Sequence, residues 1–416
     1  PDAPRPVGSG IVRNPAPVRR VAPARRVAPA RRNTVSKMLD ENDPIKPIPE
    51  GQTEGAGLFM GGSCVDDCDS CYDTCCIDQC CCCPWYASFM GLMMGRNQAN
   101  GIWTTYESAD LTNQMMKSNY GQQWKGGGEV RVGRRFCCNC WALEFGYWTL
   151  DPFYGMSMAG IPGATVSTTL EVTEVEFVGN GTTTNADAIF RNSAEQRLWR
   201  SDEFHNFEIN LLRGNFCCGG CGMGYGACWP WDTQWTLGFR YLRFRDHLIY
   251  GGVMQNNYWG DGGGLYEAYL DEHVKNNVFA FQVGFETRAP RWHNLQLYLS
   301  PKIGIGCNHI ENYYQLYRGD GGLGRPTVAS GMPGTFPVSS SKDVFSVITQ
   351  IDVGLEWNFA CNWSARIGYR LMMATGMGLA DNQIPFYIVD IPEIKDIDHN
   401  AELILHGGFA GLTYNF

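Results

Sequence analysis

The chain has 416 residues, of which 44% are hydrophobic and 13% are aromatic, and its formal net charge at pH 7 is -9. No run of 18 apolar residues occurs. This excludes a transmembrane helix but not a transmembrane β-barrel, because half of the residues of a barrel strand face the lumen. Residues 1–32 contain eight arginines and one aspartate, so the remainder is strongly acidic. A basic tail on an acidic body indicates an anionic partner or an acidic surface nearby.

Residues 1–60 are predicted to form an extended arm. The motif Val-Ala-Pro-Ala-Arg-Arg occurs at 21–26 and again at 27–32. Frequent proline fixes φ and removes backbone donors, which favours a polyproline-type arm over a helix. The arm is either a solvated linker or a segment that binds cell-wall polymer, acidic lipid or a neighbouring subunit. The sequence begins at Pro1, so we expect a removed signal peptide, an exported protein and no nucleic acid partner.

Residues 61–84 form a cysteine-rich segment, and most other cysteines fall in predicted turns. Eighteen cysteines are too many for a reducing cytosol unless they bind metal, so disulfides are predicted in an exported protein. Cys68-x-x-Cys71 and Cys218-x-x-Cys221 have zinc-like spacing, which leaves a structural metal cluster, or redox catalysis, as alternatives. A plate of disulfide-linked segments is predicted on the periplasmic side, and Cys307 is the one cysteine that lies outside it. The plate comprises Cys64, Cys68, Cys71, Cys75, Cys76, Cys80, Cys81, Cys82, Cys83, Cys137, Cys138, Cys140, Cys217, Cys218, Cys221, Cys228 and Cys361.

Residues 85–416 are predicted to contain ten strands. Short turns at 136–140, 289–293 and 359–363 alternate with long loops. In outer-membrane barrels such turns are periplasmic and the long loops are extracellular. A further strand at 306–317, with another in a loop, would give twelve. The ten strands are 85–95, 129–136, 141–150, 204–214, 235–245, 278–288, a long strand from Asn294, 344–359, 364–373 and a last strand that ends at Phe416.

The strands alternate between apolar and polar residues, and in 344–359 Ile348 is an exception on the polar face. In 344–359, Phe345, Val347 and Ile351 share one face, and Ser346 and Asp352 lie on the other, because successive side chains of a strand point to opposite faces. A soluble sandwich could hide such an apolar face in a core. However, most of these strands have 10–16 residues, which exceeds the roughly 5–6 that is typical of soluble strands and suits a tilted bilayer crossing of roughly 9–11. An all-β, antiparallel transmembrane β-barrel is therefore predicted.

Aromatic residues at the strand ends predict girdles at the two membrane interfaces. The predicted girdle residues are Trp85, Trp141, Trp148, Trp235, Trp357, Trp363, Tyr414 and Phe416. Outer-membrane lipid is accordingly the first expected partner.

The opposite strand faces carry six acids and six bases, which are predicted to point into the lumen. Eight-stranded barrels are filled by side chains, whereas open aqueous channels need about 16 strands. A network of ion pairs that fills the interior is therefore predicted, with a narrow selective channel as the alternative. The twelve residues are Glu129, Arg131, Glu144, Glu208, Arg240, Glu286, Arg288, Lys302, Asp352, Glu356, Arg366 and Arg370.

Enzyme constellations are not apparent in the sequence. The seven histidines show no metal-ligand spacing, and no Gly-x-Ser-x-Gly element occurs, so no catalytic residue, metal ligand or cofactor is predicted. The loop acids Asp381, Asp390, Glu393, Asp396 and Asp398 are interpreted as a solvated acidic rim, with calcium binding as an alternative. A surface enzyme or adhesin built from loop residues stays a second alternative for the function.

Four segments resemble recurring segments of a planctomycete outer-membrane β-barrel family, and the resemblance covers roughly 84–416. They are 85–88, 206–213, 238–244 and 277–284, and the region 381–385 and the terminal strand fit as well. The resemblance implies an outer-membrane location and a barrel, and it brings no established activity. The cysteine cluster and the Arg/Pro repeat depart from the pattern, which leaves their role open.

Together these features predict a structural or assembly role in the bacterial cell envelope. The barrel would be a homo-oligomer or part of a larger assembly, with a periplasmic N-terminus and a basic arm that contacts the cell wall or a neighbouring subunit. A narrow porin-like channel for small solutes is the alternative.

Overall fold

The computed structural model describes residues 84–97, 101–118, 124–136, 141–214, 231–331, 334–360 and 362–416. The arm, the cysteine-rich segment and the seventeen cysteines predicted to form the plate lie outside the described residues. Among the residues that are described, no helix combines the length and the hydropathy needed to cross a membrane.

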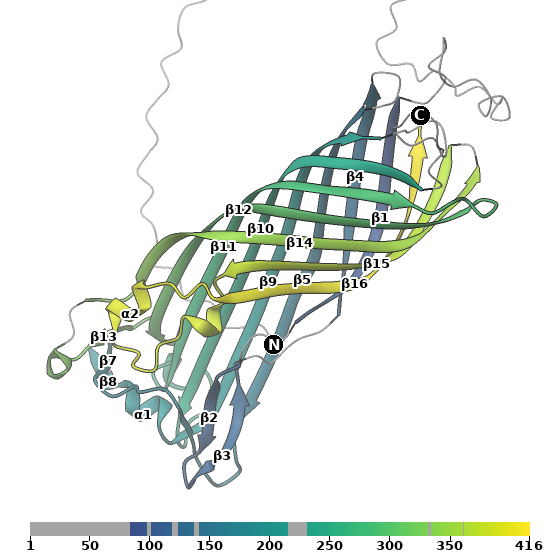
Figure 1. Cartoon of the computed structure of the whole chain (residues 1–416). Helices are drawn as coiled ribbons and strands as arrows, with labels where there is room; N and C mark the ends of the chain where they lie inside the picture. The colour runs from purple at the N-terminus through teal and green to yellow at the C-terminus, as the bar shows by residue number, and fades with distance from the viewer. Residues whose placement is uncertain are drawn as a thin grey trace, which may run out of the picture. The chain divides into compact units, whose positions relative to one another are not determined.

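Ten long antiparallel strands form a closed ring (Figure 1). Each strand pairs with the next, and β16 pairs with β1, so that Trp85 and Phe416 exchange backbone hydrogen bonds of 3.0 and 2.9 Å. The predicted all-β, ten-stranded antiparallel barrel is confirmed. In ring order the strands are β1 (Trp85–Arg96), β4 (Lys125–Phe136), β5 (Trp141–Ala159), β9 (Ser193–Arg213), β10 (Asp232–Met254), β11 (Glu267–Arg288), β12 (Leu295–Arg318), β14 (Val338–Ala360), β15 (Trp363–Met377) and β16 (Ala401–Asn415).

The two ends of the barrel differ. We call the end at which β1 begins and β16 ends the short-turn end. The opposite, long-loop end carries the remaining elements, several of which Figure 1 labels around that end. They are β2 (Trp103–Glu107), β3 (Asp110–Lys117), β6 (Val166–Thr168), β7 (Val175–Gly179), β8 (Thr182–Asn185), α1 (Ala186–Phe190), η2 (Asp261–Gly263), β13 (Leu323–Pro326), η3 (Val328–Ser330), η4 (Ala380–Asn382) and α2 (Ile391–Lys395).

The barrel strands extend further toward the long-loop end than the alternation in the sequence predicts. β10 continues to Met254 and β11 begins at Glu267, so most of the predicted loop 246–276 is strand. β12 runs without a break to Arg318. The segment 306–317 is therefore not a separate strand, and the twelve-stranded alternative is wrong. The additional pairing strands, β2, β3, β6, β7, β8 and β13, are short and lie outside the ring.

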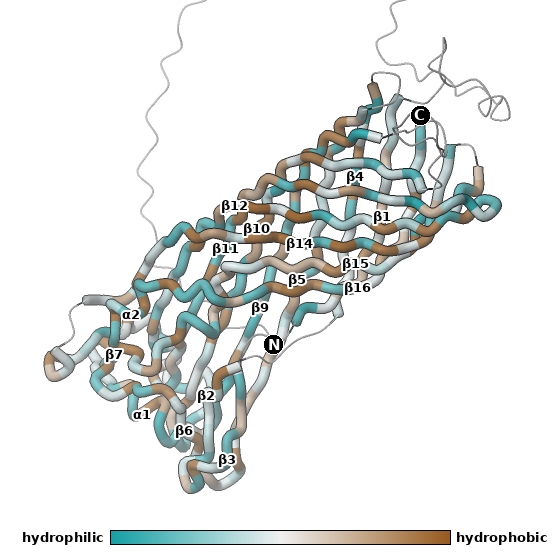
Figure 2. Tube along the Cα trace, in the orientation of Figure 1, coloured by the Kyte–Doolittle hydropathy of each residue, from teal (hydrophilic) through white to brown (hydrophobic). Residues whose placement is uncertain are grey.

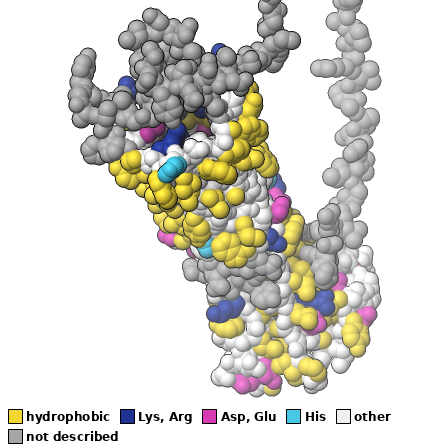
Figure 3. All heavy atoms as spheres, turned by 90° about the vertical axis from the view of Figure 1, so that its right-hand side faces the viewer, with side chains coloured by type: hydrophobic (Ala, Val, Ile, Leu, Met, Phe, Trp, Pro, Cys, Tyr) yellow, Lys and Arg dark blue, Asp and Glu magenta, His cyan; other side chains and the backbone are white. Residues whose placement is uncertain are grey.

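Outward-facing side chains form an apolar belt around the half of the barrel nearer the short-turn end. Apolar and polar residues alternate along these strands in Figure 2, and Figure 3 shows hydrophobic side chains gathered on the face that it draws. The belt includes Phe89, Val132, Phe145, Ile209, Phe239, Phe281, Ile305, Phe345, Val353, Ile367 and Leu412, all of them exposed. It ends toward the long loops at an outward polar row formed by Glu203, Arg245, Lys275, Glu311 and Asp343.

Two apolar clusters fill the inside of the ring. The middle layer includes Met90, Met94, Trp148, Phe204, Leu242, Phe244, Val278, Met372, Leu405 and Phe409. The upper core lies at the long-loop end and joins inward strand residues such as Leu248, Leu270, Ile310 and Tyr314 to residues of the long loops.

Candidate functional site: the charged interior of the barrel

The mouth at the short-turn end is lined by four of the predicted lumen charges. Glu356 and Arg366 lie directly opposite each other on β14 and β15, which is the closest approach that cross-strand side chains have. Their Oε2 and Nη2 atoms are 2.6 Å apart. Arg288 pairs with Glu286 at 2.6 Å, and Arg366 also reaches Glu286 at 3.3 Å. Arg288, Arg366 and Glu286 keep 17–19% of their side-chain surface exposed, so water reaches this mouth.

Deeper in the barrel, Arg370 of β15 pairs with carboxylates on the adjacent strand β14 and on β4. Its Nε and Nη2 donate to the two oxygens of Asp352 at 2.9 and 2.8 Å, a bidentate geometry that is among the strongest ion pairs. Its Nη1 lies 2.8 Å from Glu129 Oε2. The Arg370 and Glu129 side chains are each 1% exposed.

Glu208 is the most heavily contacted carboxylate of the network. Arg240 Nη2 donates to it at 2.7 Å and Lys302 Nζ at 2.9 Å. The side-chain amides of Asn206, Asn210 and Gln282 donate at 3.0, 3.1 and 3.1 Å. Because a buried carboxylate is costly unless it is paired and hydrogen-bonded, these five donors explain why Glu208 is stable inside the barrel.

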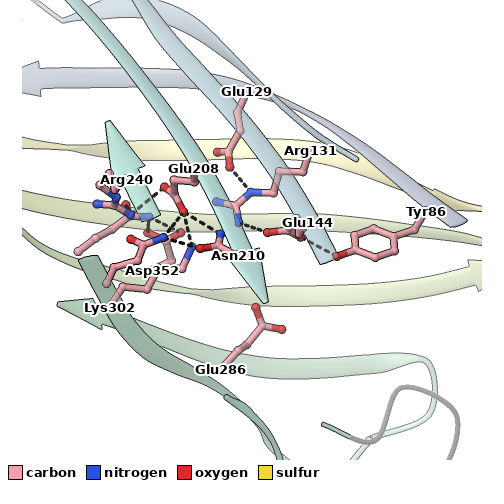
Figure 4. Close-up of polar contacts among 12 residues, drawn as sticks. Tyr86, Glu129, Arg131, Glu144, Glu208, Asn210, Arg240, Glu286, Lys302 and Asp352 are labelled. Atoms are coloured by element: carbon pink, nitrogen blue, oxygen red, sulfur yellow. Dashed lines mark hydrogen bonds and ion pairs between the residues drawn. The ribbon is translucent and has the colours of Figure 1, made fainter. Parts of the chain in front are cut away.

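Arg131 connects Glu129 to the remaining carboxylate, Glu144, as Figure 4 shows. It donates to Glu129, and its Nη1 donates to Glu144 at 3.0 Å. The hydroxyl of Tyr86 donates to the other oxygen of Glu144 at 2.9 Å. Gln350 accepts from Arg240 at 2.8 Å and donates to Asp352 at 3.1 Å, so it joins the Glu208 and Arg370 groups into one network.

All twelve predicted lumen residues thus point into the barrel. Four of them form the mouth group, Glu286, Arg288, Glu356 and Arg366. The other eight form the deep group, Glu129, Arg131, Glu144, Glu208, Arg240, Lys302, Asp352 and Arg370. Each group has as many acids as bases, so neither presents a free charge to a ligand. Within the described ranges, no group of three or more His, Cys, Asp or Glu could hold a metal ion.

The middle layer closes the barrel immediately beyond the deep group. The Trp148 ring lies 5.1 Å from the Arg370 guanidinium carbon, and its centroid lies 4.4 Å from that of Phe204. On the far side, Arg96 stacks over Phe244 at 5.0 Å. The lumen therefore changes from charged, through aromatic, to charged again, with Trp148, Phe204 and Phe244 each at most 1% exposed.

Trp148 corrects the predicted girdle. It was expected at a membrane interface, but its side chain points inward, because it shares the face of Glu144 and Gly146 on β5. That parity was the sequence signal that could have placed it inside. Trp141 is half-buried beside Arg213. The other girdle residues are exposed on the outer surface: Trp85, Trp235, Trp357, Trp363, Tyr414 and Phe416.

The predicted acidic rim also needs a correction. Asp381 is 1% exposed, and its Oδ1 accepts from Arg200 at 2.9 Å, so it is not solvated. Asp390 caps α2 by accepting from the backbone of Glu393 at 3.1 Å. Asp396 pairs with Lys342 at 3.0 Å and is exposed. These contacts hold the loop together and do not converge on one point.

Residues 230–395 match the model of a family described as Putative beta barrel porin-7 (BBP7). The fold is that of a bacterial outer-membrane barrel. The sequence-based prediction of an outer-membrane barrel is confirmed, whereas the planctomycete origin stays a prediction. The apolar belt is accordingly the surface that faces lipid.

Several solved outer-membrane proteins are similar in fold to this barrel. The outer membrane protease OmpT from Escherichia coli is 11% identical with a TM-score of 0.41, over 80% of this chain and 97% of that one. A major outer membrane protein from Thermus thermophilus is 11% identical with a TM-score of 0.27, over 79% and 99%. A Pseudomonas aeruginosa FadL homologue is 8% identical with a TM-score of 0.33, over 80% and 89%. No curated protein matches the chain.

Proposed function

We propose that the protein is a closed outer-membrane barrel with a structural or assembly role in the bacterial cell envelope, and that it is not an enzyme. The observation that carries this proposal is the filled lumen. Trp148 and Phe204 lie between the deep charged group and the upper half of the barrel, and both are buried. A barrel that conducts solutes needs a continuous wet path, and this aromatic pair obstructs one.

The proposed orientation has the short-turn end in the periplasm and the long loops outside the cell. Barrels of this class have short periplasmic turns and longer extracellular loops. The strands that flank residues 137–140, 215–230 and 361 meet the short-turn end, at which β1 also begins. The cysteines that the sequence places in those turns and in residues 64–83 would therefore share one compartment, where they could form the disulfide plate.

The basic arm is the proposed contact to other envelope components. Its eight arginines suit an anionic cell-wall polymer or the acidic surface of a neighbouring copy. Under this proposal the protein is a homo-oligomer or a component of a larger envelope assembly.

Planar-bilayer recording tests the closed lumen. The purified protein is expected to be silent at all voltages. A double variant, Trp148→Ala with Phe204→Ala, removes both rings from the middle layer and is expected to leak. Discrete conductance steps from the unmodified protein would overturn the proposal.

Electrophoresis of purified envelopes tests the assembly. Without reductant the protein is expected to migrate as cross-linked species that collapse to the monomer when thiol is added. One monomeric band under both conditions would exclude the cross-linked assembly.

A narrow porin-like channel is the second candidate. Two observations favour it: the description of the family model that matches 230–395 and the water-accessible mouth group. The bilayer experiment distinguishes the two candidates directly.

A further inference from the structure

The segment between β15 and β16, residues 378–400, folds back over the long-loop end of the barrel and is called the lid here. It contains η4 and α2. Its buried apolar side chains belong to the upper core, where they join Phe336, Val338 and Tyr314 of the wall and of another loop. The lid contributes Ile384, Ile388, Val389, Ile391, Ile394 and Ile397.

The base of the lid is attached to the barrel wall by polar contacts. Arg200 Nη2 of β9 donates to Asp381 Oδ1 of η4 at 2.9 Å. The backbone N–H of Ala380 donates to Asp246 Oδ2 of β10 at 3.1 Å. Gly378 and Asn276 exchange two hydrogen bonds of 2.8 Å. The lid is therefore held at its base by groups on β9, β10 and β11.

The wall side of this attachment is a buried cluster of charges. Arg200 Nε donates to Asp246 Oδ1 at 2.9 Å, and Arg96 of β1 pairs with Asp202 of β9. Together with Asp381, the cluster has three carboxyl groups and two guanidinium groups. All five are at most 7% exposed. An unpaired negative charge in such a place is costly, so the cluster favours retaining one proton.

The strand register brings two of these carboxyl groups together. Asp202 and Asp246 are direct cross-strand partners on the inward face, and like charges directly opposite each other are destabilising. Asp202 Oδ1 accepts no hydrogen bond from the described residues. A proton on Asp202 removes the repulsion and gives this carboxyl group a donor. Burial, and secondarily the nearby Asp246 carboxylate, raise the pKa of Asp202 to about 7 against the opposing effect of Arg96.

A second buried acid faces the same region from β11. Glu272 is 0% exposed, and neither of its oxygens has a hydrogen-bond partner among the described residues. Its register partner on β10 is Leu248, which makes it a diagonal neighbour of Asp246. Burial raises the pKa of Glu272 against the opposing effect of the Asn312 side chain, and the neighbouring carboxylates Asp271 and Asp246 add to the rise. Burial also raises the pKa of Asp381.

We propose that the lid is latched by protons: its base is held against the wall at acidic pH and is released progressively as the pH rises to neutral. The inference is independent of the proposed structural role. The sign follows from linkage. Lifting the base wets the cluster, so the open state holds its carboxyl protons less tightly than the closed state. Each proton that is held only in the closed state favours closing. Its contribution to the stability of the closed state is complete when the pH is below the open-state pKa, and it is lost as the pH rises to the closed-state pKa.

Hydrogen exchange of the full-length protein in detergent, read by mass spectrometry, tests the latch. Protection factors for a peptide that covers 378–383 are measured from pH 4.5 to 8.5. In the unmodified protein the protection is expected to fall by up to tenfold per pH unit for each linked proton, and the part linked to Asp202 is expected to level off above about pH 7. A protection factor that does not change with pH would overturn the proposal without any variant.

Variants identify the groups that hold the protons. Asp202→Asn keeps the shape and a donor toward Asp246 but cannot ionise, so it is expected to reduce the pH slope. Adding Glu272→Gln is expected to abolish the slope. Asp343→Asn, on the outer face of β14 with a 70% exposed side chain, is the matched control and keeps the slope of the unmodified protein. A double variant with an unchanged slope would contradict the latch.

Discussion

The two halves of the barrel have opposite polarity on the same strands. On β12, Ile305 faces outward into the apolar belt while Lys302 points inward to Glu208. Further along the same strand, Ile310 and Tyr314 point inward and are buried in the upper core, while Glu311 faces outward and pairs with Lys275. The alternation is unbroken. What changes is the medium outside, which is lipid at one level and water at the next.

This inversion changes what stabilises each half. Around the deep group, the interior must keep charges paired, since a lost partner leaves an uncompensated charge in a low dielectric. In the upper core the interior is apolar and is stabilised by burial from water. The lower half should thus depend on complete ion pairs, and the upper half on close packing.

The largest expected effect comes from breaking the deep group. Glu208→Ala removes the acceptor of Arg240 and Lys302 and should cost about 3–5 kcal/mol in the free energy of unfolding, measured by urea titration in lipid vesicles. Glu311→Ala, which breaks a partly exposed pair, is the control and should cost less than about 1 kcal/mol. Equal losses in the two variants would contradict the contrast between the halves.

A charge placed on the outer face of β12 should distinguish the two media. Ile305→Arg puts a cation into the lipid-facing belt, where about 2–4 kcal/mol is expected near the bilayer midplane. Gln315→Arg lies on the same face beyond the polar row and should change stability by less than about 0.5 kcal/mol. Both are read from the same unfolding assay, and a comparable loss for Gln315→Arg would place the membrane boundary elsewhere.

Removing one methyl group probes the same inversion on a finer scale. Ile310 is 0% exposed inside the upper core, so Ile310→Val should cost about 0.5–1.5 kcal/mol. Ile305→Val should cost nearly nothing in vesicles, because the removed methyl group was in contact with lipid in the folded state. A larger loss at residue 305 than at residue 310 would reverse the assignment of the core.

The smallest effect is expected from the outward pair of His247 and Asp271, which lies beyond the polar row with His247 Nε2 and Asp271 Oδ1 2.7 Å apart. Burial lowers the pKa of His247, but the hydrogen bond and charge of Asp271 outweigh this and raise it overall. Its contribution to stability is therefore present below the ordinary value of 6.5 and is lost as the pH rises through the raised pKa.

Asp271→Asn tests this pair. It should lower stability at pH 6 by less than about 1 kcal/mol, since the pair is partly exposed, and by less still at pH 8. The neighbouring His273 stays neutral in this interval, because burial and the nearby His247 lower its pKa to about 4. A loss that grows with pH would be the wrong sign for the proposed pairing.

The ring and its charged interior could be predicted from the sequence because both depend on a period of two. Within the belt, every inward residue is flanked by lipid-facing neighbours. Alternate positions of a strand therefore point into the lumen, which is where the structure has residues such as Glu129 and Arg370. The predicted strands end several residues short of the observed ends at the long-loop end. Beyond the polar row the inward residues are apolar and the outward ones polar, so the apolar residues shift from odd to even positions and the pattern appears to stop. Trp148 was predicted wrongly because tryptophan is enriched at membrane interfaces, although its place in the alternation of β5 points inward.

The buried cluster under the lid could not be predicted, for a different physical reason. Arg96, Arg200 and Asp381 are separated by 104 and 181 residues in the sequence, and no local pattern records that three segments meet. Asp381 belongs to an acid-rich loop segment, which predicts an exposed side chain. It is buried only because the lid folds back onto the barrel wall.

Cys307 faces outward between Phe279 and Phe345, its register partners on β11 and β14. All three are exposed on the outer surface. Thiol exchange needs a reagent that reaches the sulfur, and charged reagents do not partition into hydrocarbon. Its surroundings thus protect this sulfur from water-borne oxidants, whatever the compartment does to other thiols. Charged maleimides supplied in water should therefore leave it unmodified while the barrel is in the bilayer and should modify it once the barrel is unfolded, which makes it a native reporter of membrane insertion.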